Sequence, residues 1–486
     1  MSRRVLIGLE LLLLAAAAWQ TWEVGAAMAA RLQANFDLEW MEGATLITGL
    51  RASEGLPFYT RPSPDYVPFI YPPLYAWILG LLAQVFPLGY TLGRAVSIVS
   101  TVAASAAIVF GAWREGARPA LALGCGALFL GCYADGGTFY DLVRTDALSI
   151  ALLGWALVLA RRWPVAGGLL LAVAFAAKHH AALFGFPLVF ALWRTEGRAT
   201  ALRFAVASVV PALLFTIAMQ VQTGGLFVTY LLGVPANHGI MLDRALPNLG
   251  ASGRPQGAQW ELWKALPITT TAVLLLTWRW PIYWIGVAIT GLLTASLMRG
   301  HHGGYLNVLI PMLWIQALLP ALALRASAWR FTPHLVTLLV AVQVVQGRES
   351  LARYLPRPAD AQNAERLIDE LRALPEPLLI PHAPWYGVLA GHAPSLALIT
   401  LWDIDHTGGP LDDEVRVIRD AMAGHHWASI VIPDGKLGYD LRKYYRVVGR
   451  IESPAVPTRT GWNVRLKQVW APALDGDAAP ATPSDE

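Results

Sequence analysis

The stretch Phe36-Asp37-Leu38-Glu39-Trp40-Met41-Glu42-Gly43 follows the first long apolar run of the sequence and opens its first long polar loop. Glu39 and Glu42 are three residues apart, so on a helix they would share one face. Asp37 is offset from them and could cap that helix. An acidic trio is also typical of a solvated helix beside a membrane. Which interpretation holds depends on the rest of the chain.

The composition predicts a membrane protein. Of the 486 residues, 55% are hydrophobic and only 14% are charged, and the mean hydropathy is +0.46. A soluble domain contains about 25% charged residues. The net charge is +4, and many arginines lie in short loops between apolar runs, which is a topology signal and argues against a nucleic-acid partner. Cys125 and Cys132 share one apolar run, so we expect buried free thiols.

The apolar runs predict a polytopic helical protein with about eleven spans. Arg3 and Arg4 place the N-terminus in the cytoplasm, and the first run is interpreted as an uncleaved signal anchor. The loop 31–71 then lies outside, and the short run 73–86 is expected not to cross fully. Two short runs flank Lys178, which indicates a break near the outer face. The predicted spans are 5–28, 92–113, 121–133, 147–160, 165–177, 181–193, 204–221, 265–277, 281–298, 306–324 and 335–345.

The composition changes at the end of the membrane domain, which we assign to residues 1–346. In 347–471 charge rises and helix and strand patterns alternate, which predicts a small α/β domain outside the membrane. Its expected helices are 360–373 and 412–422, and its expected strands are 378–381, 429–433, 445–451 and 464–469. Residues 472–486 are rich in Ala, Pro and Asp and are expected to be disordered. The sequence contains no nucleotide-binding glycine loop.

Placed on this topology, the unusual polar residues gather on the outer side. Ionisable residues at membrane depth carry a large free-energy cost and usually have a function. The gathered residues are Glu39, Glu42, Tyr71, Asp141, Arg144, Asp146, Lys178, His179, His180, His238, His301, His302 and Asn307. Taken singly, each group has a structural alternative: snorkelling side chains, an ion pair, or a plain loop. Together they predict a cavity that faces the outer leaflet and contains carboxylates and cations.

Such a cavity suits transfer of a sugar from an activated, lipid-linked donor. A hydroxyl acceptor is a poor nucleophile, and a carboxylate whose pKa is raised by burial can act as its general base. A departing polyprenyl phosphate gains negative charge, which Arg or Lys can stabilise. A base on one face of the sugar and the leaving phosphate on the other would give inversion.

The order of the motifs resembles the GT-C class of polytopic glycosyltransferases. This class includes protein O-mannosyltransferases, the aminoarabinose transferase of lipid A and the lipopolysaccharide-core galacturonosyltransferases. The resemblance spans roughly residues 31–311 and rests on Glu39-Trp40-Met41-Glu42-Gly43, Ile70-Tyr71-Pro72-Pro73-Leu74-Tyr75, Gly93-Arg94-Ala95-Val96-Ser97, Val143-Arg144-Thr145-Asp146, Lys178 and Gly303-Gly304-Tyr305-Leu306-Asn307. It implies a polyprenyl-phosphate-sugar donor, a glycolipid, polysaccharide or protein acceptor, and a site on the periplasmic face of a bacterial inner membrane.

The resemblance also implies roles for residues. Glu39 would be the catalytic base, with Glu42 or Asp37 as the alternatives. Three cations would hold the donor phosphate: Arg94, Arg144 and Lys178. The rest of the substrate site would be Tyr71, Asp146, His179, His301, His302 and Asn307. Some relatives bind a divalent metal ion at the acidic site, although no spacing of His and carboxylate residues dictates one here.

Two other functions compete with the glycosyltransferase. A transporter or flippase of a lipid-linked glycan would also need charged residues at depth, but the chain shows no matched halves with interrupted helices. A non-catalytic scaffold that presents the α/β domain would leave the gathered polar residues unexplained. In that domain, His382, His392, Asp403, Asp405 and His406 are interpreted as solvated loop residues, and the domain is expected to cover the cavity or help bind the acceptor.

Overall fold

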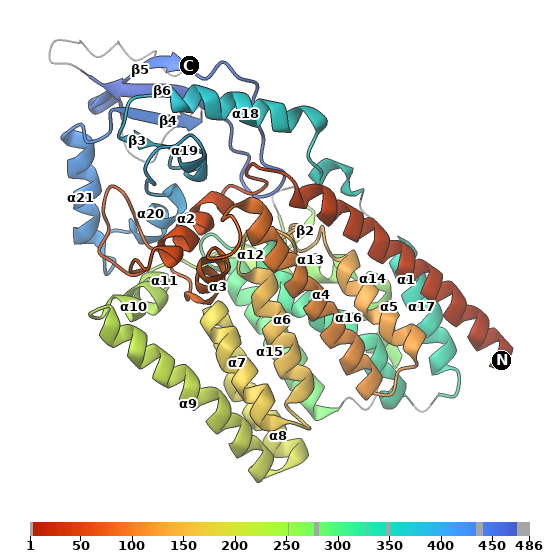
Figure 1. Cartoon of the computed structure of the whole chain (residues 1–486). Helices are drawn as coiled ribbons and strands as arrows, with labels where there is room; N and C mark the ends of the chain where they lie inside the picture. The colour runs from red at the N-terminus through yellow and green to blue at the C-terminus, as the bar shows by residue number, and fades with distance from the viewer. Residues whose placement is uncertain are drawn as a thin grey trace.

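The computed structural model describes residues 3–250, 252–276, 281–327, 329–346, 350–433 and 441–473. Most of these residues are helical, and a small four-stranded sheet lies near the C-terminal end of the chain (Figure 1). The predicted fold class, an apolar helical protein with a small α/β domain, is therefore confirmed.

Five stretches are long and apolar enough to cross a membrane, judged by length and composition in the described part of the chain. Each coincides with a predicted span. They are α1 (Arg3–Leu32), α4 (Tyr90–Arg114), α9 (Arg198–Gln222), α15 (Ile282–Gly300), and the 3₁₀ turn η3 (Leu306–Leu309) with α16 (Ile310–Ala326).

The other predicted spans correspond to shorter helices. A helix of 14 residues, such as α6 or α7, is about 21 Å long, less than the roughly 30 Å of a bilayer core. The count of about eleven spans therefore stays a prediction. These helices are α5 (Pro119–Gly131), α6 (Asp146–Leu159), α7 (Pro164–Ala177), α8 (Gly185–Glu196), α14 (Pro267–Leu276) and α17 (Thr332–Gln346).

The loops carry further short elements. The helix α3 (Leu74–Leu82) has nine residues and is too short to cross, as expected. The predicted break at Lys178 is also present, because α7 ends there and a 3₁₀ turn, η1 (His179–Phe184), follows. The remaining loop elements are α2 (Glu42–Ser53), α10 (Leu226–Val228), the π turn η2 (Thr229–Gly233), α11 (Val234–Ala236), α12 (Leu242–Ala245), β1 (Asn248–Leu249), β2 (Pro255–Gln256) and α13 (Ala258–Ala265).

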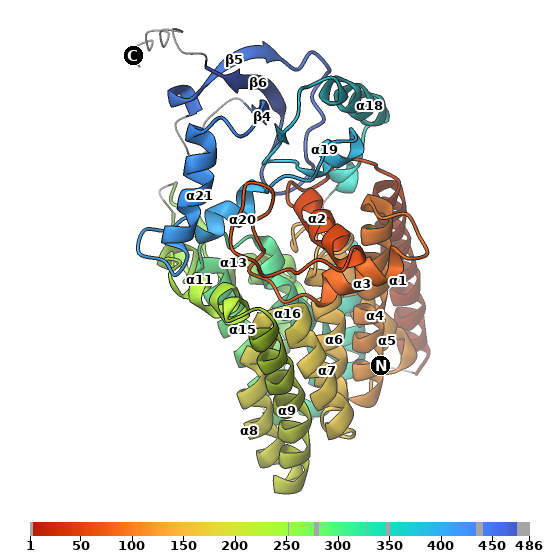
Figure 2. The same cartoon turned by 60° about the vertical axis from the view of Figure 1, so that its left-hand side comes forward.

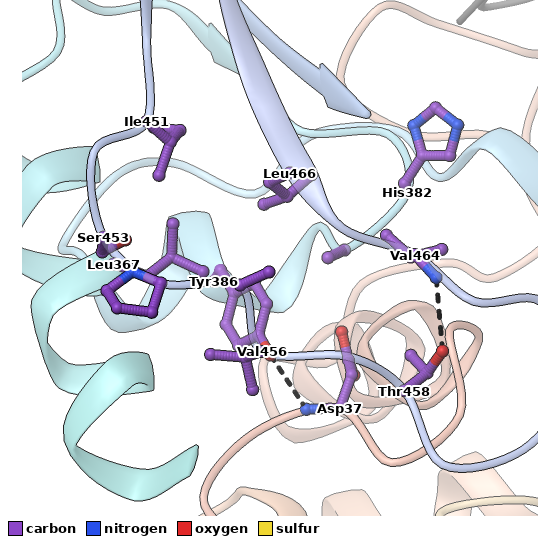
Figure 3. Close-up of a pocket in the computed structure, with 13 residues that line it drawn as sticks. Asp37, Leu367, His382, Tyr386, Ile451, Ser453, Val456, Thr458, Val464 and Leu466 are labelled. Carbon is purple, nitrogen blue, oxygen red and sulfur yellow. Dashed lines mark hydrogen bonds between the residues drawn. The ribbon is translucent and has the colours of Figure 1, made fainter. Parts of the chain in front are cut away.

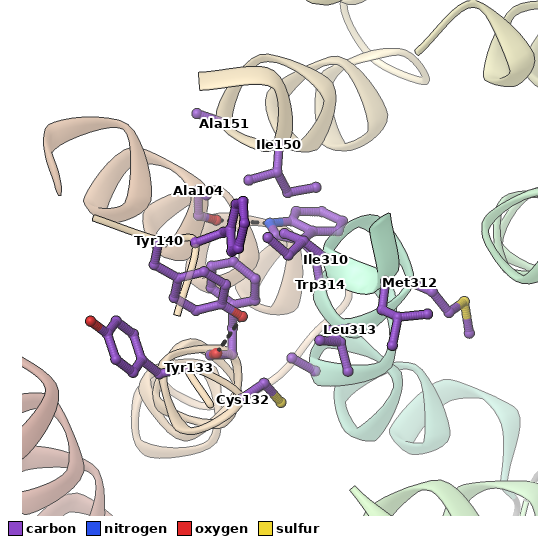
Figure 4. Packing of buried hydrophobic residues seen from close by; sticks show 14 of the residues in the cluster. Ala104, Cys132, Tyr133, Tyr140, Ile150, Ala151, Ile310, Met312, Leu313 and Trp314 are labelled. Carbon is purple, nitrogen blue, oxygen red and sulfur yellow. Dashed lines mark hydrogen bonds between the residues drawn. The ribbon is translucent and has the colours of Figure 1, made fainter. Parts of the chain in front are cut away.

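The helix α16 forms the centre of the membrane-type core. Its Trp314 is fully buried and donates a hydrogen bond from Nε1 to the carbonyl of Ala104 on α4, at 2.9 Å (Figure 4). Gly154 on α6 packs against the same indole, and a Cβ there would lie 2.8 Å from it. Close approach of the helices therefore depends on small residues, as in other packed membrane helices.

The C-terminal part is an α/β unit whose predicted strands and helices are confirmed. The sheet order is β3-β4-β6-β5, with β3 and β4 parallel and the other pairs antiparallel. Its elements are η4 (Leu351–Tyr354), α18 (Pro358–Arg372), β3 (Leu378–Leu379), α19 (Trp385–Leu389), α20 (Leu398–Ile404), α21 (Asp412–Ala423), β4 (Ser429–Pro433), η5 (Leu441–Lys443), β5 (Tyr445–Arg450) and β6 (Leu466–Pro472). The strand β6 includes Pro472, and residues 474–486 of the predicted tail lie outside the described residues.

This α/β unit lies over the first loop, at one end of the helical bundle (Figures 1 and 2). The loop between β5 and β6 forms an isolated parallel bridge from Thr460 to Glu39. The backbone N–H of Arg459 donates to the carbonyl of Leu38 at 2.7 Å. The acidic stretch is thus enclosed between the membrane helices and the α/β unit, as the expected covering role requires.

Candidate active site

Glu42 is the anchor of the acidic stretch. It begins α2 and is fully buried. Its Oε2 accepts hydrogen bonds from the backbone N–H groups of Leu38 and Glu39, at 2.7 and 3.3 Å, and its Oε1 accepts one from the N–H of Val143 at 2.9 Å. Burial by itself would raise the pKa of Glu42, but Arg94 and these N–H groups outweigh it and lower that pKa below its ordinary value. Glu42 is therefore an ionised structural carboxylate.

Arg94 uses every one of its N–H groups inside the protein. Its Nε and Nη2 bind the two oxygens of Glu42 at 2.9 and 2.7 Å. Its remaining donors bind the backbone carbonyls of Arg31, Ala34 and Phe36. A guanidinium has five N–H donors, so none is left for a ligand. The geometry thus contradicts the expectation that Arg94 holds the donor phosphate, because Arg94 pins the first loop to α4.

Asp37 is a buried carboxylate that is bound by the residues around it. Its Oδ1 accepts hydrogen bonds from the Gly43 backbone and the Tyr90 hydroxyl, at 3.1 and 2.9 Å. Its backbone N–H donates to the hydroxyl of Tyr386 in α19, as Figure 3 shows. Burial raises the pKa of Asp37 well above its ordinary value, and the charge on Glu42 adds to the effect. Asp37 lines the cavity of Figure 3 together with His382.

Glu39 is the carboxylate that stands beside the predicted cations. It is 1% exposed, and its Oε2 accepts a hydrogen bond from the Met41 backbone at 3.2 Å. The same oxygen lies 3.9 Å from Nη1 of Arg144. Burial raises the pKa of Glu39 to about 7, although Arg144 opposes the rise. A carboxylate with this pKa is suited to act as a general base near neutral pH.

Asp146 joins three of the predicted substrate residues. Its Oδ1 accepts hydrogen bonds from Lys178 Nζ at 2.6 Å and from Asn307 Nδ2 at 2.8 Å. Its Oδ2 lies 4.0 Å from Nε of Arg144. These residues come from the start of α6, the end of α7 and the turn before α16. The structure therefore brings together residues that are up to 163 positions apart, from Arg144 to Asn307.

Arg144 is the least satisfied cation of the group. Its Nη2 lies 3.5 Å from the Tyr71 hydroxyl, and its guanidinium lies over the rings of Tyr71 and Phe139 at 5.6 and 5.7 Å. Its Nη1 is buried and forms no hydrogen bond with the described residues. A buried donor without a partner costs free energy unless a ligand satisfies it. Nη1 is thus placed to bind an anionic oxygen.

Asp403 of α20 completes the group, and the sequence interpretation missed it. Its charge interacts with both Arg144 and Tyr71. Burial raises the pKa of Asp403 to about 7, although Arg144 opposes the rise. His382 is enclosed, and Asp403 is partly buried within α20, so neither is the solvated loop residue that the sequence predicted. In the sequence, Asp403 stands directly after Trp402, and no motif links that position to the membrane domain.

An aromatic cavity is lined in part by Arg144. Tyr59, Tyr66, Phe69, Tyr71 and Tyr75 line it, with Thr45 and Thr48 of α2. Its walls come from the first loop, α2, α3 and the turn before α6. Apolar walls with a single cation at one end suit a ligand that is largely hydrocarbon and ends in an anionic group.

The two histidines after α15 lie in a separate cluster. The rings of His238, His301, His302 and His406 pack together, with centroids 4.8–5.5 Å apart. His238 Nε2 hydrogen-bonds the carbonyl of Asp403 at 2.7 Å. His301 uses its ring nitrogens within the same region, with Nε2 3.1 Å from the carbonyl oxygen of Pro235 and Nδ1 2.9 Å from that of His302. His179 interacts electrostatically with Lys178, which pairs with Asp146, and with His301 of the histidine cluster.

The candidate metal ligands do not fit a metal ion. Among residues 3–250, 252–276, 281–327, 329–346, 350–433 and 441–473, no three or more His, Cys, Asp or Glu side chains are arranged to hold one. The acidic stretch points its carboxylates in different directions, and Glu42 is already neutralised by Arg94. The described residues therefore offer no metal site to the proposed reaction.

Comparison with known proteins gives a fold but no sequence relative. No family model matches the chain, and no curated protein matches it. The structure is similar to that of ArnT from Cupriavidus metallidurans bound to undecaprenyl phosphate, with a TM-score of 0.55 and 13% identity over 93% of this chain and 97% of that one. The apo state of the same protein gives 0.55, 14%, 94% and 98%. This chain has the ArnT fold.

The similarity is one of fold, and together with the five helices long and apolar enough to cross a membrane it supports a multi-pass membrane protein. The site residues separate into three sets on this fold. Glu39, Arg144, Asp146, Lys178, Tyr71 and Asn307 are brought together. Glu42 and Arg94 form the anchor beneath them, and Asp37 faces the cavity of Figure 3. The histidines form the neighbouring cluster.

Proposed function

We propose that this protein is a membrane glycosyltransferase that moves a sugar from a polyprenyl phosphate to a hydroxyl group of its acceptor, a glycolipid, polysaccharide or protein. One observation carries the proposal. A buried carboxylate, Glu39, whose pKa is raised to about 7, lies 3.9 Å from a buried cation, Arg144, that has an unused donor. Sugar transfer from a phosphate requires both a base and an anion-binding group in one site.

The donor fits the aromatic cavity and Arg144, the cation that lines it. The polyprenyl chain would lie among the aromatic walls, and the phosphate would bind Nη1 of Arg144. Lys178 is paired with Asp146 at 2.6 Å, so it adds positive charge and also fixes the position of that carboxylate. The structure of ArnT bound to undecaprenyl phosphate supports this choice of donor.

The reaction is a single displacement. Glu39 accepts the proton of the acceptor hydroxyl as its oxygen forms a bond to the anomeric carbon of the donor. The bond between that carbon and the phosphate oxygen breaks, and the electron pair leaves with the phosphate. Arg144, with Lys178 behind it, stabilises the charge that develops there. Attack on the face opposite the leaving group inverts the anomeric configuration.

The other two acidic residues have supporting roles in this scheme. Glu42 holds the turn that presents Glu39, because it accepts hydrogen bonds from the backbone N–H groups of Leu38 and Glu39 and from the guanidinium of Arg94. The Asp37 carboxylate accepts hydrogen bonds from the Gly43 backbone and the Tyr90 hydroxyl, and its backbone N–H binds Tyr386 of the α/β unit. We further propose that the protein lies in a bacterial inner membrane, with residues 1–346 as the membrane domain, a cytoplasmic N-terminus, and the α/β unit in the periplasm.

The test is a transfer assay with purified protein in detergent. A panel of polyprenyl-phosphate sugars is supplied with a membrane glycolipid extract, and released polyprenyl phosphate is measured by mass spectrometry. Glu39→Gln keeps the size of the side chain and removes the base, so we expect release to fall at least about a hundredfold. Retained turnover in this variant would move the base to Asp37 or Glu42.

A negative result in this assay would favour the transporter hypothesis. If a folded preparation binds polyprenyl phosphate but releases none from any donor, the glycosyltransferase proposal is wrong. A flipping assay in liposomes with a lipid-linked glycan would then follow.

A further inference from the structure

Three tryptophans from distant parts of the chain form a cluster beside Glu39. The rings of Trp402 and Trp462 are stacked, with centroids 5.3 Å apart and planes 22° from parallel. Trp40 meets both rings, at 5.9 and 5.2 Å. We call Trp40, Trp402 and Trp462 the indole cluster. Its members come from the first loop, from α20 and from the loop between β5 and β6.

Each member of the indole cluster follows or precedes a residue at the candidate site. One member directly follows Glu39, and another directly precedes Asp403. The third directly follows Gly461, whose Cα is so close to Glu39 that a Cβ there would lie 3.1 Å from Oε1. The three segments that build the edge of the site therefore each contribute one indole.

The cluster differs from the structural tryptophans of this chain. Trp314 and Trp427 are almost completely enclosed, as expected for residues that only fill a core. Trp462 is 40% exposed, and its two partners are only partly buried. Three partly exposed aromatic rings together form the kind of surface that marks a binding site.

Polar groups border the aromatic surface. The ring of His382 lies 5.2 Å from that of Trp462, and its Nδ1 is buried without a hydrogen-bond partner among the described residues. His382 also lines the pocket shown in Figure 3. An aromatic face beside unpaired hydrogen-bonding groups matches a molecule that has both C–H faces and hydroxyl edges.

We propose that the indole cluster binds a sugar ring of the acceptor, so that the acceptor is a saccharide and not a peptide. The faces of a pyranose carry C–H groups, which the negatively charged face of an indole attracts, and its hydroxyls point outward to polar neighbours. A ring held there would lie beside the segment that carries Glu39, because Trp40 follows Glu39 and Trp462 follows Gly461. This inference rests on the proposed function, because it takes Glu39 as the base.

Direct binding tests the inference without any donor. The full chain is purified in a detergent without a sugar headgroup, and saturation-transfer NMR is recorded with maltotriose, chitotriose, core oligosaccharide released from lipopolysaccharide, and a Ser/Thr-rich peptide. We expect at least one saccharide to bind. Trp402→Leu and Trp462→Leu should weaken its binding about tenfold, which corresponds to about 1.4 kcal/mol, whereas Trp462→Phe should retain most of it. Trp193→Leu on α8 is the matched control, because Trp193 is 45% exposed and lies far from the cluster in sequence.

Polyprenyl phosphate binding is measured on every variant to show that it is folded. The inference is wrong if wild type binds no saccharide, if it binds only the peptide, or if folded Leu variants bind saccharide as tightly as wild type. A wild type that binds saccharide through the cluster but transfers no sugar would overturn the proposed function alone. A wild type that transfers sugar to a peptide would overturn this inference alone.

Discussion

The raised pKa of Glu39 makes a prediction about pH. A general base works in its deprotonated form, and burial raises the pKa of this carboxyl to about 7. We therefore expect kcat/KM to fall about tenfold for each pH unit below 7 and to level off above it, because kcat/KM reports ionisation in the free enzyme. A carboxylate with an ordinary pKa would give a flat profile between about pH 6 and 8. Initial rates of polyprenyl phosphate release from pH 5.5 to 8.5 measure the profile.

Asp403 supplies the control for this profile, since its pKa is also raised to about 7 by burial. Asp403→Asn should keep the inflection near pH 7 if Glu39 is the titrating group. Loss of the inflection in this variant would assign the ionisation to Asp403.

The pair of Arg94 and Glu42 makes a prediction about stability. Both side chains are fully buried, and two hydrogen bonds join them in a bidentate ion pair. Removing one partner leaves an uncompensated buried charge, which costs about 3–5 kcal/mol. We expect Arg94→Ala to lower the free energy of unfolding by about this amount, and Arg94→Met with Glu42→Leu to lower it less. Thermal unfolding of the purified variants tests the prediction.

The same variants separate the two roles considered for Arg94. If Arg94→Ala unfolded at the wild-type temperature but no longer bound polyprenyl phosphate, Arg94 would be a phosphate ligand after all.

At the scale of elements, the loop between β5 and β6 controls the position of Glu39. Gly461 has a φ of +70°, and a Cβ there would lie 3.1 Å from Glu39 Oε1. Gly461→Ala should therefore displace the base and reduce transfer at least about tenfold, since small misplacements of reacting groups have large effects on rate. The transfer assay, with polyprenyl phosphate binding as the check on folding, measures this effect.

Gly253 provides a matched control for that substitution. It has the same φ of +70°, but a Cβ there would meet nothing within 4 Å. Gly253→Ala carries the same backbone strain of about 1–2 kcal/mol without touching Glu39. Equal loss of activity in both variants would mean that strain, and not displacement of Glu39, is the cause.

The ends of the short helices show what the local sequence can predict and what it cannot. Asp146 begins α6, and Lys178 follows the last residue of α7, so the apolar runs between charged residues predicted both helices closely. The ion pair between these two charges joins residues 32 positions apart and depends on α6 packing against α7. The local sequence predicted where each helix ends, but it did not predict that Asp146 and Lys178 would form an ion pair.

At the scale of the whole molecule, packing reassigned several residues. Arg94 and Arg144 are both arginines near acidic residues, and nothing in the local sequence distinguishes them. In the structure, one is saturated by Glu42 and three carbonyls, and the other keeps a buried donor. Asp403 lies in a segment without motifs, and only the docking of the α/β unit on the first loop brings it to the site.

By itself, the sequence determined that the chain is a polytopic helical protein with an α/β unit after residue 346, because apolar runs and alternating patterns are local properties. It also placed Glu39, Arg144, Asp146 and Lys178 among the candidate residues. Only the tertiary structure decided which carboxylate is desolvated next to an unsatisfied cation and which is neutralised. Both outcomes depend on burial and on distances between segments far apart in the chain, and these are set by packing.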